Sequence, residues 1–140
     1  FIEYKNLTAD EKETFDLVAP IIELVNKKYG KNIPDIKISE TIRIDKSGFV
    51  SEGVWDSEEN AIIIKRSILK SKETFDGVLM HEFAHYASGY TDNTRDFENE
   101  LTDMLGFVYN ELSIKKEKPK KAGLFKRGWS KIKHVCSVIH

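Results

Sequence analysis

The stretch "SKETFDGVLMHEFAHYAS", residues 71–88, predicts a helix that decides both the fold and the chemistry of the chain. Its apolar residues recur at helical spacing and form one face, made of Phe75, Val78, Leu79, Phe83 and Ala84. Ser71 stands where an N-cap is expected, and Gly89 is placed to end the helix. The same segment carries two histidines four residues apart, His81 and His85, with Glu82 directly after the first.

This His-Glu-x-x-His spacing predicts a metal site. Residues at i and i+4 of a helix project from the same face, so the imidazoles of His81 and His85 can reach one tetrahedral Zn²⁺ ion. Glu82 lies beside that face, where its carboxylate can act as general base on a water that zinc has acidified. Two helical histidines can also be surface residues or paired core residues. Here the apolar flanks predict burial, and buried imidazoles beside a buried carboxylate need a compensating partner.

A catalytic zinc site is expected to have a third protein ligand and one open position. Four acidic residues follow the second histidine closely: Asp92, Asp96, Glu98 and Glu100. Asp92 is better suited to be the N-cap of the next helix, and Asp96 lies further from that helix's apolar stripe. Glu98 and Glu100 flank the stripe on its two sides. A ligand must point into the interface between the helices, which favours Glu98, with Glu100 as the alternative.

Other periodic segments predict a small α+β domain. Helices are expected at 7–30 and 92–114, and strands at 35–44, 47–56 and 60–66. The first helix starts with a capping box of Thr8 and Glu11, stops at Gly30, and is expected to kink at Pro20. A bulge is expected near residues 40 and 41. The last helix should bury one stripe, formed by Phe97, Leu101, Met104, Leu105, Val108 and Leu112.

The metal motif resembles that of the zincin metallopeptidases of the gluzincin type, in which a glutamate on the next helix completes the site. Related zincins carry that glutamate four residues before Asp, Asn or Ser, and Glu98 with Thr102 approximates this spacing. The pair Asn99-Glu100 is similar to the asparagine-glutamate motif of thermolysin-like enzymes, so Glu100 stays open as third ligand. The resemblance implies a minimal zincin-like domain, with a three-stranded sheet packed on the active-site helix and two further helices.

A second resemblance covers most of residues 1–107. The segments "ISETIRI", "IIIKRSILKS" and "VLMHEFAHYASGYTDNTRDFENELTDMLG" look like the metallopeptidase-like domain at the C-terminal end of some bacterial proteins that begin with a chaperone/histidine-kinase type ATPase domain. The likeness implies that a further domain of the same polypeptide is a partner. A chain that opens on Phe1 rather than Met fits that expectation.

In zincins an edge strand beside the metal helix pairs with an extended peptide, and the resemblance implies that residues 60–66 form this strand. The other interpretation makes "AIIIK" an internal strand buried on both faces. Three tyrosines, Tyr86, Tyr90 and Tyr109, are candidate donors to an oxyanion, although aromatic packing is the favoured role for each.

The charge distribution predicts a boundary near residue 114. Residues 1–114 carry 13 basic against 22 acidic side chains, whereas residues 115–140 carry nine basic side chains against Glu117 alone. We therefore expect a metallopeptidase domain over 1–114 and a basic tail over 115–140. The pattern of apolar and basic residues in the tail predicts an amphipathic helix, which can contact an anionic membrane, an acidic partner or the acidic domain itself. Nucleic acid would be bound through phosphate contacts only, without sequence specificity.

The sequence thus predicts a zinc-dependent endopeptidase acting on a protein or peptide substrate in the cytoplasm, a location that the single cysteine, Cys136, favours. The alternative is a non-catalytic zinc-binding module that regulates or recruits a partner within a larger ATPase-containing protein. Glu82 favours the enzyme, because a purely structural zinc site has no use for a carboxylate at that position.

Overall fold

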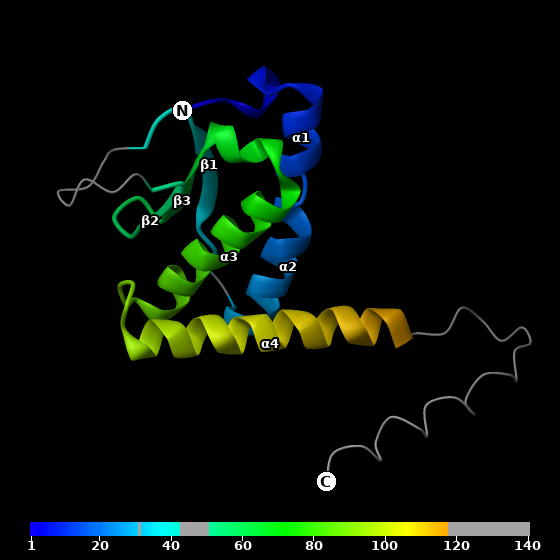
Figure 1. Ribbon diagram of the computed structural model, residues 1–140, viewed down its shortest axis with the longest axis vertical. Coiled ribbons are helices and arrows are strands. Elements are labelled where there is room, and N and C mark those ends of the chain that lie inside the picture. The colour runs from blue at the N-terminus through cyan, green and yellow to red at the C-terminus, as the bar shows by residue number, and fades with distance from the viewer. Residues whose placement is uncertain (31, 43–50, 118–140) are drawn as a thin grey trace, which may run out of the picture.

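The computed structural model describes residues 1–30, 32–42 and 51–117 of the chain. It is an α+β domain in which α3 (Lys72–Ser88) lies between a small sheet and a pair of shorter helices (Figure 1). Helix α4 (Arg95–Glu117) runs across the ends of α3 and of the longer helix of that pair, α2 (Val18–Tyr29). The predicted fold class is confirmed. Within the described residues, no helix combines the length and the apolar character needed to cross a bilayer.

The N-terminal segment forms η1 (Tyr4–Asn6), α1 (Ala9–Phe15) and α2 (Val18–Tyr29). The capping box of Thr8 and Glu11 is confirmed. The expected kink at Pro20 is wrong, because the helix breaks earlier, between α1 and α2, and Pro20 falls in the first turn of α2. A missing backbone N–H costs little there, since the first turn has no carbonyl partner for it.

The sheet has the order β1-β3-β2. β1 (Asp35–Ser39) pairs in parallel with β3 (Ala61–Lys65), and β2 (Gly53–Asp56) pairs with β3 in the antiparallel sense. β1 ends at Ser39, so the predicted strand does not run on through residues 40–42. Residues 43–50, which include parts of two predicted strands, lie outside the described residues.

The strand β3 is the centre of the sheet, and this corrects the expectation that residues 60–66 form the edge beside the metal helix. Three of its side chains, Ala61, Ile62 and Ile64, are fully buried, as the internal-strand interpretation predicts. The strand at that edge is β2. Edge and centre depend on pairing with distant segments, which the local pattern of "AIIIK" does not encode.

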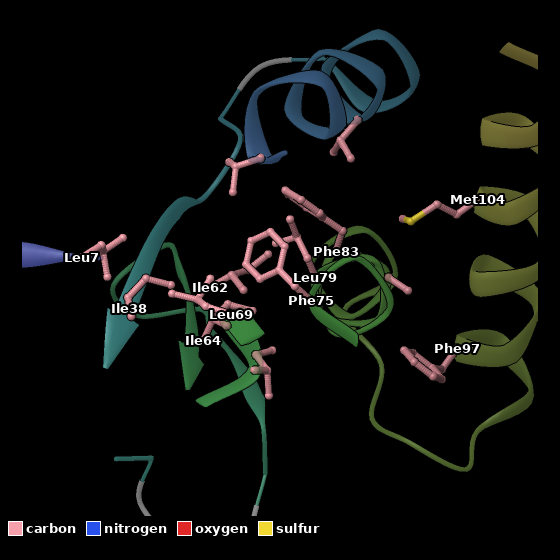
Figure 2. Close-up of a cluster of buried hydrophobic side chains, with 14 residues drawn as sticks. Leu7, Ile38, Ile62, Ile64, Leu69, Phe75, Leu79, Phe83, Phe97 and Met104 are labelled. Atoms are coloured by element: carbon pink, nitrogen blue, oxygen red, sulfur yellow. The ribbon is translucent and has the colours of Figure 1, made fainter. Parts of the chain in front are cut away.

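The core fills the space between the sheet and α3 (Figure 2). Ile62 and Ile64 from the sheet meet Phe75, Leu79 and Phe83 from α3, all with no measurable exposure. Each such side chain contributes roughly 1.5–3 kcal/mol by leaving water. The 3₁₀ helix η2 (Arg66–Lys70) leads from β3 into α3, and the hydroxyl of Ser71 accepts from the Thr74 backbone N–H as the expected N-cap.

Helix α4 packs on α3 through only part of its predicted stripe. Phe97 and Met104 are buried, whereas Leu105 and Leu112 are about half exposed, at 57% and 49%, so their predicted burial is wrong. Contacts with α2, including the ion pair of Lys27 and Glu111, turn a different side of α4 inward. The helix continues to Glu117, past the boundary expected at residue 114. The predicted amphipathic tail helix and Cys136 lie outside the described residues.

Candidate metal centre

The helix α3 presents its two histidines to an open cleft while its other side is buried in the core. His85 has a side-chain exposure of 15% and His81 one of 38%, whereas Phe83 and Ala84, between them in sequence, have none. The i, i+4 spacing therefore places both imidazoles on the cleft side of the helix, as the sequence predicts. Their ring centroids are 4.8 Å apart.

The turn after α3 brings a carboxylate back to the histidines. Gly89 adopts the left-handed conformation (φ 69°), and its N–H bonds to the His85 carbonyl at 2.8 Å, so the helix ends there and the chain reverses. Asn93 is also left-handed (φ 63°). Between these two residues the chain passes the histidines, and Asp92 points its carboxylate at them.

Three donor atoms converge in this arrangement. The Asp92 Oδ1 lies 3.0 Å from His81 Nε2 and 3.3 Å from His85 Nε2, and the two Nε2 atoms are 3.1 Å apart. Ligand distances of ~2.0–2.1 Å around a tetrahedral zinc ion place neighbouring donors about 3.3 Å apart. Among the described residues this is the group of three side chains whose donor atoms fit a metal ion. The two-imidazole, one-carboxylate set also suits zinc chemically.

The backbone of the turn fixes the orientation of His85. Its Nδ1 donates to the carbonyl oxygen of Tyr90 at 2.8 Å. Because a carbonyl can only accept, the proton resides on Nδ1 and the lone pair of Nε2 faces the other two donors. Hydrogen bonds of this kind orient histidine ligands in metal sites. The sequence reasoning missed this contact, since it involves a backbone group of the turn.

An aromatic wall backs the histidines. Phe97 of α4 stacks on the His85 ring at 4.3 Å between centroids and meets the His81 ring edge-on at 4.9 Å. Phe97 is itself buried, at 4% exposure. It therefore restrains both imidazoles from the α4 side. The sequence identifies Phe97 only as an apolar stripe residue.

Glu82 is buried beside the histidines, at 6% exposure. Burial raises the pKa of Glu82 to about 7; an electrostatic effect of the neighbouring His85 and a hydrogen bond from the Trp55 backbone oppose this, and Asp92 adds a smaller upward effect. A carboxyl group with this pKa can accept a proton near neutral pH and release it again. The sequence predicts Glu82 at this position but not how closely β2 approaches it.

The other acidic candidates are directed elsewhere. Glu98 and Asp96 are exposed in the first turn of α4, and neither belongs to the converging group. Glu100 accepts a hydrogen bond from the Tyr29 hydroxyl of α2. Asp92 was expected to cap α4, but Thr94 does so, since its hydroxyl oxygen accepts from the Phe97 backbone N–H at 3.3 Å. This leaves the Asp92 carboxylate directed at the two histidines, and of the four acidic candidates it is the one that belongs to the converging group of donor atoms.

The tyrosines divide among three environments. Tyr86 packs edge-on against Trp55 at 5.3 Å, which is the expected aromatic role. Tyr90 is about half exposed and lines the cleft. Tyr109 is 76% exposed on α4 and is not among the cleft residues.

The cleft has a volume of about 960 Å³ and contains all three converging side chains and Glu82. Its opposite wall is β2 and the residues next to it. The Lys65 N–H bonds to the Glu52 carbonyl at 2.9 Å, so in the alternating antiparallel pattern Gly53 and Trp55 direct their backbone groups away from β3. The free edge of the sheet therefore borders the site.

Comparisons of the chain with protein-family models, with curated proteins and with solved structures found no match.

Proposed function

We propose that this chain is a zinc-dependent endopeptidase whose metal is held by His81, His85 and Asp92. The observation that carries the proposal is the convergence of their three donor atoms, at 3.0–3.3 Å from one another, in an open cleft next to the buried carboxylate of Glu82. A bound zinc ion would supply a Lewis acid that polarises a carbonyl group and acidifies a water molecule.

The side chains of the cleft would divide the remaining work. Glu82 takes the proton of the attacking water and later delivers it to the leaving amine, a role suited to a carboxyl group with a pKa near neutrality. Tyr90 is the candidate to donate a hydrogen bond to the developing oxyanion, because it lines the cleft and Tyr109 does not.

An extended peptide is the substrate that the cleft wall suits. The two edges of the sheet differ. The edge at β1 is covered at Ile38, whose carbonyl accepts from the Ile2 N–H at 2.8 Å. At the β2 edge the outward backbone groups of Gly53 and the outward carbonyl of Trp55 border the cleft, whereas the Trp55 N–H donates a hydrogen bond to Glu82. A peptide added to β2 would gain main-chain hydrogen bonds and lie beside the metal ligands. Residues 53–56 therefore take the role of the edge strand that pairs with the substrate, which the resemblance implied for residues 60–66.

The rival function is a zinc module that only holds structure. A structural zinc site is closed by four protein ligands, whereas three side chains converge here among the described residues and the cleft gives access to the fourth position. These features favour catalysis. A cytoplasmic protein substrate and a regulatory domain in the same polypeptide complete the proposal, on the strength of the resemblance and the single cysteine.

The test is zinc content and proteolysis measured together on the same preparations. Wild type loaded with one equivalent of zinc should cleave an unfolded protein or a quenched fluorescent peptide mixture, and a chelator should abolish the cleavage. Glu82→Gln should keep its zinc and lose about 10²–10⁴-fold in rate. Zinc-loaded wild type that cleaves no protein or peptide, or a Glu82→Gln variant as active as wild type, would contradict the proposal.

A further inference from the structure

The close approach of β2 to α3 depends on a residue without a side chain. Gly53 is buried and lies in the edge strand, opposite Ile64 of β3. A Cβ atom built on Gly53 would stand 2.6 Å from Val78 Cγ1, 3.0 Å from Glu82 Cγ and 3.1 Å from Glu82 Oε1. The first of these distances is shorter than side chains tolerate, and the other two require Glu82 to move.

The same strand approaches the Glu82 carboxylate again two residues later, at Trp55. Trp55 directs its backbone N–H toward the free edge, and this backbone hydrogen bonds to Glu82. The side chain of Glu82 therefore runs past Gly53 toward the edge of the sheet. A glycine at position 53 leaves that path open, because any other residue places a Cβ atom in it.

We propose that Gly53 is a positioning residue for Glu82: its missing side chain admits the carboxylate between α3 and β2 and aims it into the cleft. The inference rests on the proposed function for its catalytic consequence. Its geometric content, that a side chain at position 53 displaces Glu82, stands without it.

The discriminating variant is Gly53→Ala in the full 140-residue chain. We expect zinc binding to persist, because the three atoms nearest to a Cβ at position 53 belong to Val78 and Glu82 and not to the metal ligands. We expect kcat to fall by about 10-fold, because Glu82 must move by a few tenths of an ångström, less than the ~1 Å misplacement that costs about 100-fold. KM should change by less than about threefold, since the backbone groups of β2 that would pair with a peptide remain. Gly106→Ala is the matched control, because a Cβ there meets nothing within 4 Å.

A second variant separates displacement of Glu82 from general crowding. In Gly53→Ala/Val78→Ala the contact at 2.6 Å is removed and only the contacts with Glu82 remain. Thermal stability should recover in this double variant while kcat stays low. Recovery of both would overturn the inference, because crowding against Val78 would then account for the whole effect.

A crystal structure of zinc-loaded Gly53→Ala supplies a readout that does not require activity. The Glu82 carboxylate should be displaced by at least a few tenths of an ångström from its wild-type position, because its Cγ and Oε1 atoms must move away from the added Cβ. An unmoved Glu82, or a wild-type kcat in Gly53→Ala, would overturn the inference while leaving the proposed function intact. Inactive wild type with a displaced Glu82 in the variant would contradict the proposed function and support the geometric inference.

Discussion

The turn between α3 and α4 and the first turns of α4 both carry acidic side chains, yet they relate differently to the histidines. In the turn, the left-handed residues Gly89 and Asn93 redirect the chain so that Asp92 faces both Nε2 atoms. In the helix, Phe97 occupies the side that faces the imidazoles, and Glu98 beside it is exposed. A regular helix fixes each side chain at 100° from the last, whereas a turn can aim one side chain freely.

Because only Asp92 of the two acidic regions faces the histidines, substitutions of Asp92 and Glu98 should differ most in their effect on zinc affinity. Asp92→Ala should weaken zinc binding by at least about 100-fold, more than the loss of an outer hydrogen-bond partner of a ligand. Glu98→Ala should leave the zinc Kd within about twofold, because its carboxylate is not among the converging donors. Competition with a chromophoric chelator measures both. Equal losses in the two variants would show that α4 contributes a ligand after all.

The stability of the metal-free protein should depend on pH through Glu82. Its pKa is about 7 in the folded chain against an ordinary value of 4.5, so the folded state holds an extra proton between these pH values. Stability should therefore fall as the pH rises through this window, by at most about 3 kcal/mol in total. Urea unfolding at pH 4.5–8 with a chelator present measures it, and Glu82→Gln should lack this component.

The same titration sharpens the comparison of the two acidic regions. Asp92 raises the pKa of Glu82, whereas no carboxylate of α4 is among the causes of that shift. The pH range over which the stability falls should consequently move to lower pH in Asp92→Asn and stay in place in Glu98→Gln. A shift in Glu98→Gln of the same size would contradict this.

Straining the backbone of the turn at Gly89 should have a smaller effect on zinc binding than removing the Asp92 carboxylate. Gly89→Ala places a Cβ in a left-handed residue, at a cost of roughly 1–2 kcal/mol in the free energy of unfolding. Its Cβ meets nothing within 4 Å, so the cost is conformational, and zinc binding should weaken in parallel. Thermal denaturation with and without zinc measures both effects. A variant as stable as Gly106→Ala would argue against the left-handed turn.

The smallest effect is expected at the start of α4. Thr94→Ala removes the hydroxyl that accepts from the Phe97 N–H and should cost about 1 kcal/mol of stability. Asp92→Ala in the metal-free protein should cost less, because Asp92 does not cap this helix. Denaturant unfolding with a chelator present compares them, and a larger loss in Asp92→Ala would restore the capping role to Asp92.

The parts of the site that follow from the sequence are those that one helix determines by itself. His81, Glu82 and His85 belong to one periodic segment with a recognisable cap and stop, so their relative positions are local. The third donor depends on a turn. The signal in the sequence is that Thr94 can also cap the helix after Gly89, which leaves Asp92 free of that role. The capping preference of aspartate concealed it.

Non-local pairing accounts for the remaining differences in the fold. The pattern of β3 predicts a strand but not whether it is central, and the approach of β2 to Glu82 through Gly53 has no local signature. Similarly, Leu105 and Leu112 continue the apolar spacing of α4, but the ties to α2 leave them partly exposed. Pro20 is compatible with the start of a helix as well as with a kink, and a second helix beginning at Val18 decides between them.

The proposed metal site is tested most directly by a crystal structure of the zinc-loaded chain, with the metal located by anomalous scattering at the zinc edge. We expect one ion at ~2.0–2.2 Å from His81 Nε2, His85 Nε2 and an Asp92 oxygen, with the fourth position open to the cleft and Glu82 beside it but not coordinated. An oxygen of Glu98 or Glu100 in place of Asp92, or a fourth protein ligand that closes the site, would contradict it.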